Sequence, residues 1–172
     1  MVMALLLALI MNQEGLPWRG FYRTVYFIPV ITSWVAVSFI WVWLFEPRYG
    51  LVNSLLQLVN ITGIKWLASP TWALPAIIIV AIWKDLGFGM VIFLAGLQDI
   101  PRELYEAAKI DGVNRWQNFR YITFPLLNPT IVFLTVTGLI GSLQVFTPAV
   151  IMTTTQGEAG GPINSTRVMV YH

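Results

Sequence analysis

The sequence has no cysteine and a single histidine, His172, at its last position. Without cysteine there is no disulfide framework, no thiolate metal site and no cysteine nucleophile, and one histidine cannot form a histidine metal cluster. We therefore expect neither a metal nor a cofactor. Charge is scarce as well, since 10% of the residues are charged and the net charge is +2. The basic residues form no run that could follow a phosphate backbone, so the sequence predicts no nucleic-acid partner.

Apolar residues are abundant instead. They make up 57% of the 172 residues, and the mean hydropathy is +0.72. A soluble domain of this length has a much larger share of charged residues. Because several apolar runs reach the length of membrane-crossing helices, the sequence predicts an all-α integral membrane protein surrounded by lipid.

Three apolar runs are long enough to cross a membrane, which takes roughly 20 helical residues. They cover residues 22–45, 72–97 and 126–145. A fourth run, 2–11, is too short to span alone. We interpret it as the tail of a spanning helix whose first half is missing.

Pro29 lies inside the run 22–45. A proline within a helix removes one backbone donor and kinks the helix, which membrane proteins tolerate where other groups satisfy the freed carbonyl. We expect neighbouring helices or the hydroxyl groups of Thr32 and Ser33 to do so.

Three polar segments lie between or after the spanning runs, and their basic residues predict the orientation. Residues 46–71 are rich in turn residues and contain a short apolar helix, 51–59, that we expect along the membrane surface. Residues 148–167 form a loop rich in glycine and threonine. The loop 98–125 carries four basic residues, and the two other loops together carry three: Arg102, Lys109, Arg115 and Arg120 against Arg48, Lys65 and Arg167. The loop 98–125 is therefore predicted to be cytoplasmic, and the loops 46–71 and 148–167 extracytoplasmic.

The loop 98–125 predicts two short helices. Asp99 and Pro101 are helix-start residues, and "RELYEAAKI" consists mostly of good helix formers until Gly112, which can take the left-handed conformation that ends a helix. A second helix is predicted to start at Asn114 as its cap and to run to a break at Pro125.

One side of the first helix is suited to contact another protein. Leu104, Ala107 and Ala108 share a face, and two adjacent alanines leave the backbone open to close approach. Glu106 adds a charge for a basic partner. Local pairing remains an alternative, because Glu106 and Lys109 are three residues apart and such a pair contributes about 0.2 to 0.5 kcal/mol. Asp111 and Arg115, four apart, are a second local pair.

The loop resembles a known signature. Glu106-Ala107-Ala108, then Gly112, then Ile122 and Pro125 match the "EAA" pattern E-A-A-x3-G-x9-I-x-L-P of binding-protein-dependent ABC importer permeases, with phenylalanine in place of the leucine. The segments "FYRTVYFIPVI", "WVWLFEPRYGLVNSLL", "FLAGLQDIPRELYEAAKIDG" and "GGPINSTRVMVYH" are similar to the carbohydrate branch, the maltose and glycerol-phosphate type permeases.

The resemblance implies a MetI-like bundle in the bacterial cytoplasmic membrane that moves a sugar by alternating access. Its implied partners are ABC ATP-binding subunits, a second permease subunit and an extracytoplasmic sugar-binding protein. The loop would be the coupling helix, with ATP hydrolysis left to the partner. The implied coupling residues are Leu104, Glu106, Ala107, Ala108, Asp111 and Gly112. Because that bundle normally has six core spans, residues 1–172 are interpreted as an incomplete, truncated transmembrane domain with three complete spans plus partial ones.

Polar groups inside the spans suggest a substrate path. Lys84 and Asp85 lie near the middle of the run 72–97, where charges are costly unless they face protein or water. The alternative is packing, because Gly87 and Gly89 beside them allow close approach of another helix.

Ser142 and Gln144 are polar groups in the last run that could contact a sugar hydroxyl. The alternative is hydrogen bonding between helices, with Gly138 and Gly141 allowing close packing.

Two other classes of protein remain as alternatives. A membrane enzyme would need convergent acids within the spans, but Asp85 is the only acid there, and the side chain of Lys84 points about 100° away from it on a helix. A non-transporting scaffold that binds a cytoplasmic partner through the loop 98–125 would differ from an importer in one respect. Its partner's ATPase would not respond to a sugar-loaded binding protein.

Overall fold

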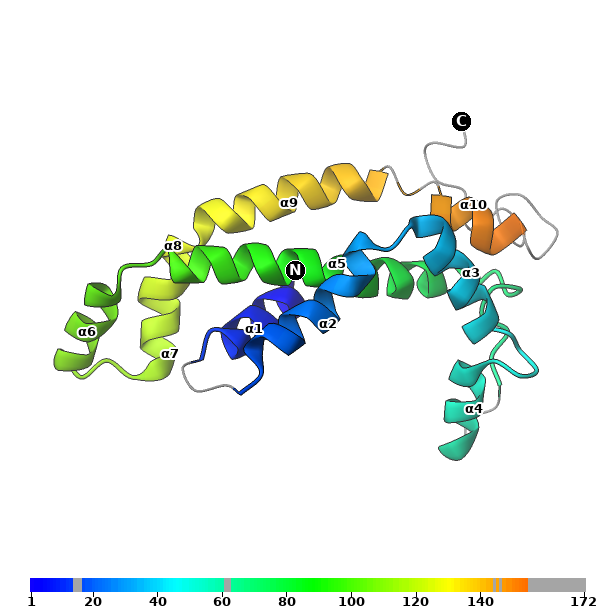
Figure 1. Ribbon diagram of the computed structural model, residues 1–172, viewed down its shortest axis with the longest axis horizontal. Helices are drawn as coiled ribbons and strands as arrows, with labels where there is room; N and C mark the ends of the chain where they lie inside the picture. Colours follow the sequence, from blue (N-terminus) through cyan, green and yellow to red (C-terminus); the bar gives the residue numbers. More distant parts are fainter. Residues whose placement is uncertain (14–16, 61–62, 144, 146, 155–172) are drawn as a thin grey trace. The chain divides into compact units, whose positions relative to one another are not determined.

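The computed structural model describes residues 1–13, 17–60, 63–143, 145 and 147–154. Every regular element within these ranges is a helix, which agrees with the predicted all-α fold (Figure 1). The chain divides into two compact units. Unit 1 comprises Met1–Val30 and Asp85–Leu139, and unit 2 comprises Ile31–Lys84 and the chain from Ile140 onward.

The helices follow one another with short connections. In chain order they are α1 (Val2–Met11), α2 (Arg19–Ile31), α3 (Trp34–Leu44), α4 (Leu51–Leu58), α5 (Ala73–Gln98), α6 (Arg102–Ile110), α7 (Arg115–Asn118), the π-helix η1 (Phe119–Thr123), α8 (Phe124–Leu126), α9 (Asn128–Leu143) and α10 (Thr147–Thr154). Among the described residues, α5 is the one continuous helix that is long and apolar enough to cross a membrane. Up to three spans result if each of two bent helix pairs is counted as one.

Small residues bring the helices of unit 1 together. The second half of α5 packs against α1 and α9, and Figure 1 shows α9 running alongside it. A Cβ atom added to Gly89 would lie 3.0 Å from the Cβ of Ala4, and one added to Gly87 would collide with the carbonyl oxygen of Tyr26. The close backbone approach predicted at these two glycines is thus confirmed.

Unit 2 has its own apolar core, formed by α3, the first half of α5, the connection after α4, and α10. Its buried side chains include Val37, Trp66, Val80 and Met152. The prediction that residues 148–167 form a loop is wrong at its start, because the chain to Thr154 is helical. Ala149, Met152 and Thr153 recur at helical spacing and are buried, and α10 packs on α3. The rest of that predicted loop lies outside the described residues.

The predicted span 22–45 is not one continuous helix. It is divided between α2 and α3, and Pro29 lies inside α2, three residues before the break at Thr32 and Ser33. Ser33 begins α3, because its hydroxyl accepts a hydrogen bond from the Val35 backbone N–H at 3.3 Å. The residue acts as a helix cap, which differs from the predicted role of satisfying the carbonyl freed by proline.

The predicted break at Pro125 lies elsewhere. The chain stays helical through Pro125 to Leu126, and the bend of 61° comes before α9, at Leu127. The backbone ahead of the proline is the π-helix η1, in which the Phe124 N–H donates to the Phe119 carbonyl. A π-helical turn is wider than an α-helical one, so it gives the proline ring room beside the carbonyl four residues earlier.

Candidate functional site

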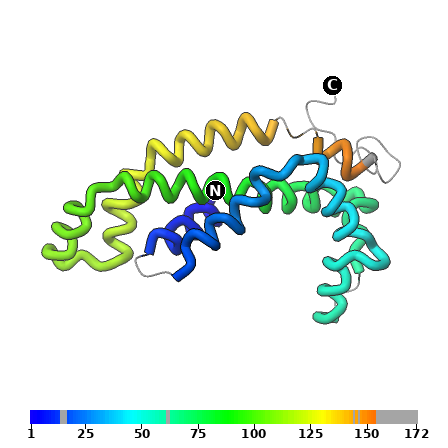
Figure 2. Tube along the Cα trace, in the orientation of Figure 1, coloured from blue at the N-terminus to red at the C-terminus, as the bar shows by residue number. Residues whose placement is uncertain are grey.

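The loop 98–125 folds into two short helices, as predicted. The first of them, α6, begins after Pro101 and ends at Ile110. Glu103 lies in its first turn and Lys109 in its last, so both charges complement the helix dipole. Figure 2 shows α6 and α7 as neighbouring segments at one end of unit 1.

Gly112 ends α6 in the predicted left-handed conformation, with φ of +72°. The Gly112 N–H donates to the Lys109 carbonyl at 3.3 Å, and the Val113 N–H donates to the Ala108 carbonyl at 3.0 Å. This pair of hydrogen bonds is a Schellman motif, which satisfies the last carbonyls of a helix. A residue with a Cβ atom is strained at this φ, so the turn depends on glycine.

Asn114 begins the second helix, α7, as predicted. Its side chain accepts a hydrogen bond from the Gln117 N–H at 2.9 Å, and its own N–H donates to the Gln117 side chain at 3.0 Å. The two residues form a capping box that satisfies two backbone donors. Both helices of the loop therefore have defined ends set by local sequence.

The surface of α6 is divided between an exposed and an inward side. Glu106 and Ala107 are exposed, Leu104 is 42% exposed and Ile110 is 86% exposed. Ala108, by contrast, is 5% exposed. The alanine pair is therefore split, because Ala107 is open to another protein while Ala108 packs within the chain.

Two local ion pairs were considered for the loop from its sequence. Within the described residues, no ion pair joins Glu106 to Lys109 or Asp111 to Arg115. The local pairs considered from the sequence are therefore absent there. Glu106 stays available on the exposed face, which favours the interpretation that it meets a basic group of another protein.

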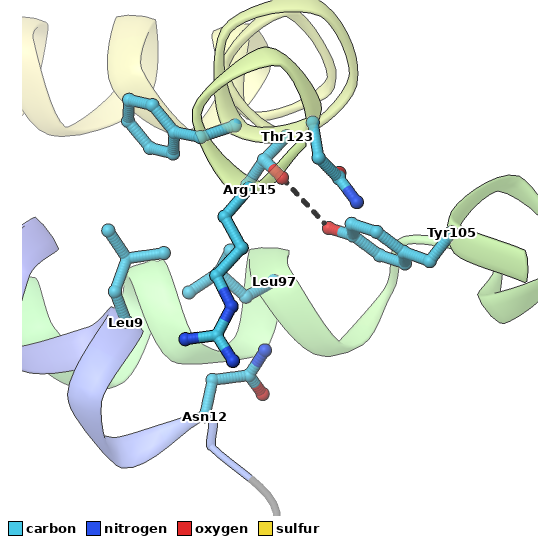
Figure 3. Close-up of a pocket in the computed structure, with 8 residues that line it drawn as sticks. Leu9, Asn12, Leu97, Tyr105, Arg115 and Thr123 are labelled. Atoms are coloured by element: carbon cyan, nitrogen blue, oxygen red, sulfur yellow. Dashed lines mark hydrogen bonds between the residues drawn. The ribbon is translucent and has the colours of Figure 1, made fainter. Parts of the chain in front are cut away.

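A pocket of about 250 Å³ lies behind the loop (Figure 3). Side chains from five elements line it, and the guanidinium group of Arg115 extends between Leu9 and Asn12. At its edge, the hydroxyl groups of Tyr105 and Thr123 share a hydrogen bond of 3.2 Å. The bond connects the two helical halves of the loop.

Neither Tyr105 nor Thr123 was singled out from the sequence. Thr123 is 5% exposed, although it lies in the connection between two predicted spans. A buried hydroxyl needs a partner, and the tyrosine tip supplies it. The sequence did offer one signal for this pair: each of the two predicted helices, which a tight turn joins, carries a hydroxyl side chain that could meet the other.

Lys84 has partners within unit 2. Its side chain is 4% exposed, its ammonium group donates to the Thr32 carbonyl at 2.9 Å, and it lies 4.9 Å from the centre of the Trp34 ring. A carbonyl acceptor and an aromatic face both stabilise a buried cation. These contacts favour the packing alternative for Lys84. Asp85, next to it on α5, is exposed.

Ser142 and Gln144 are the other two residues considered for a substrate path. Ser142 is exposed near the end of α9, and Gln144 lies outside the described residues. A Cβ atom added to Gly138 or Gly141 would have no neighbour within 4 Å in the described part of the chain. The close helix packing considered for these glycines is therefore not made by the described residues.

Known proteins resemble the chain over almost its whole length. It is 44% identical over 166 residues to the lactose transport system permease protein LacF of Rhizobium radiobacter, an alignment that covers 95% of this chain and 54% of that protein. It is 35% identical over 171 residues to the trehalose/maltose transport system permease protein MalF of Thermococcus litoralis, covering 99% and 57%. The chain thus spans about half the length of these curated relatives.

A solved structure supports the same relationship. The crystal structure of a bacterial ABC transporter involved in the import of the acidic polysaccharide alginate has a TM-score of 0.72 and 31% sequence identity, covering 87% of this chain and 56% of that one. The family model described as "Binding-protein-dependent transport system inner membrane component" matches residues 1–169. The chain belongs to this family of inner membrane components of binding-protein-dependent transport systems.

Proposed function

We propose that the chain is the membrane part of a permease subunit in an ATP-driven importer for a carbohydrate. The observation that carries this proposal is α6, an exposed helix that bears the Glu106-Ala107-Ala108 signature, ends at a left-handed Gly112 and belongs to a chain of this family. The carbohydrate class is supported by the relatives, which are named for lactose and trehalose/maltose transport.

The loop 98–125 lies in the cytoplasm in this proposal and docks on an ATP-binding subunit. The face with Leu104, Glu106, Ala107 and Ile110 enters a groove of that subunit, and Glu106 meets a basic side chain there. Ala108 and Gly112 do not contact the partner directly in this proposal. Ala108 packs α6 onto its own unit, and Gly112 fixes the end of the helix. Asp111 caps the helix beside that turn.

The remaining partners follow from the importer class. The loop 46–71 and the segment 148–167, which begins within α10, face the outside and receive a sugar from an extracytoplasmic binding protein. A second permease subunit completes the transport path. This subunit hydrolyses no ATP itself, because its role is to switch access between the two faces of the membrane when the ATP-binding subunits close.

Polar groups within the predicted spans are proposed to form the substrate path. Ser142 and Gln144 of the last predicted span are proposed to contact a sugar hydroxyl. Asp85 of α5, which is exposed, is proposed separately as a polar group that faces the substrate. Lys84 is proposed to act structurally, because its ammonium group is held by the Thr32 carbonyl and the Trp34 ring.

Reconstitution tests the proposal directly. The transporter is assembled in proteoliposomes with its ATP-binding subunits, partner permease and binding protein, and ATP hydrolysis is measured with lactose, maltose, trehalose or an arabinose oligosaccharide on the binding protein. We expect one of these sugars to raise the hydrolysis rate and to enter the vesicles. Binding of the ATPase with no response to any loaded binding protein would instead identify a scaffold.

A further inference from the structure

Tyr105 ties α6 to the rest of its unit. Its ring is half-buried against the apolar cluster formed by α1, α5 and α9, on the inward side of a helix whose other side carries Glu106. Its hydroxyl group bonds that of Thr123, 18 residues later in the chain (Figure 3). The proposed docking helix is thus joined by a directed polar contact to the far end of the loop.

Thr123 in turn leads into the spans. Its side chain bonds Tyr105, while its carbonyl accepts the Leu127 N–H at 3.0 Å. Leu127 is fully buried at the bend that begins α9, and its Cδ2 atom would lie 3.1 Å from a Cβ atom added to Gly96 of α5. The contacts therefore run without interruption from α6 through Thr123 to both long helices of unit 1.

The backbone at Thr123 is suited to movement. This residue ends the five-residue π-helix η1, and a bend of 61° follows four residues later. π-Helical turns are rare, and their hydrogen bonds are shifted relative to the α-helix on either side, so they are places where a helix can change register. The pocket beside the Tyr105–Thr123 bond leaves space for such a change.

A hydrogen bond and an apolar contact transmit motion differently. Ala108 also packs inward from α6, but its methyl contact is non-directional and each atom pair in it contributes little. The hydrogen bond has a preferred length and direction, so it resists both approach and separation. The Tyr105–Thr123 hydrogen bond therefore adds a directed tie between α6 and the end of the loop.

We propose that the Tyr105–Thr123 hydrogen bond is the mechanical link that converts movement of α6 into movement of the α8–α9 bend. Tyr105 and Thr123 are positioning residues in this scheme, which rests on the proposed importer function. Neither residue is needed for the exposed face of α6 to bind an ATP-binding subunit. Docking and transmission are therefore separable.

Removal of either hydroxyl group tests the link in the reconstituted transporter. Tyr105→Phe and Thr123→Val keep ring and shape but lose the hydrogen bond. We expect each to lower the stimulation of ATP hydrolysis by the loaded binding protein about three- to tenfold, the range corresponding to one hydrogen bond. The double variant should fall no further than either single variant, because both remove the same interaction. Co-purification with the ATP-binding subunits should be unchanged.

Two matched variants serve as controls. Thr123→Ser retains a hydroxyl group and should retain stimulation, and Tyr121→Phe removes a hydroxyl from a 73% exposed tyrosine of the same π-helix. Full stimulation in Tyr105→Phe, or losses in the two single variants that multiply in the double variant, would overturn the proposed link. No stimulation in the unmodified transporter would overturn the importer function instead, so the two failures are distinguishable.

Discussion

The loops 46–71 and 98–125 are of similar length, but they are held in opposite ways. The first is organised around one buried side chain, Asn53, which is 2% exposed. Its amide nitrogen donates to the carbonyls of Pro47 and Ile64, and its oxygen accepts from the Ile64 N–H and the Trp66 indole N–H. The ring of Trp66 then contacts those of Phe45 and Trp72.

In the loop 98–125, which lies within the described residues, the structure shows no buried side chain that bonds several distant backbone groups as Asn53 does. Many of the hydrogen bonds in this loop are helix caps between residues close in sequence, and a side-chain bond across the loop joins Tyr105 to Thr123. The first loop is therefore a small folded structure fixed from inside. The second consists of two helices whose ends are set by local caps and whose inward side chains, such as Ala108 and Thr123, pack on unit 1.

Substitution of Asn53 should produce the largest effect of the three, a loss of stability. It would also remove the difference between the two loops, because the loop 46–71 would lose its buried hydrogen bonds. Asn53→Ala leaves buried partners without hydrogen bonds, including the Trp66 indole N–H, and we expect a destabilisation of about 2 to 4 kcal/mol. Thermal unfolding in detergent measures it. The control is Gln57→Ala, which changes an exposed side chain of α4. Equal unfolding temperatures for the two variants would mean that the loop 46–71 is not held at Asn53.

A change at Gly112 should have the next largest effect, on docking rather than on stability. Gly112→Val places a β-branched residue at φ of +72°, which disturbs the end of α6. We expect about tenfold weaker association with the ATP-binding subunits, measured by co-purification and titration, since tenfold corresponds to about 1.4 kcal/mol. Gly112→Asn is the matched control because asparagine tolerates this conformation. Unchanged association of the valine variant would show that docking does not depend on the turn.

Charge reversal on the exposed face should have the smallest effect. Glu106→Lys is expected to weaken association about three- to fivefold at low salt, and the difference should shrink as salt is added, because exposed charges are screened. Glu103→Lys on the same helix is the comparison. A specific contact predicts a larger loss at Glu106, and equal losses would indicate that only the net charge of the loop matters.

Local sequence signals correctly predicted where the helices of the loop 98–125 begin and end. The end of α6 at Gly112 and the start of α7 at Asn114 follow from glycine and asparagine chemistry, which acts over a few residues. The long helix α5 was predicted from apolar length alone. Such features depend on the neighbouring sequence, so one sequence is enough to find them.

Features that depend on distant partners were not predicted. Asn53 was read as part of an apolar surface helix, because its partners lie up to 13 residues away and one is an indole group. The continuation of helix through Pro125 was missed because a π-helical turn has no clear sequence signal. The inward position of Ala108 was missed because both sides of α6 carry small or apolar residues.

Lys84 has a consequence for how the chain is built into a membrane. An isolated α5 helix would hold an ammonium group near its middle, which translocon-based scales set at about 2.5 to 3.5 kcal/mol unfavourable. The acceptor that holds it, the Thr32 carbonyl, belongs to a segment that leaves the ribosome earlier. Synthesis in this order makes the Thr32 carbonyl before Lys84, so the long apolar helix α5 can enter the membrane beside a neighbour that already carries the acceptor for its charge.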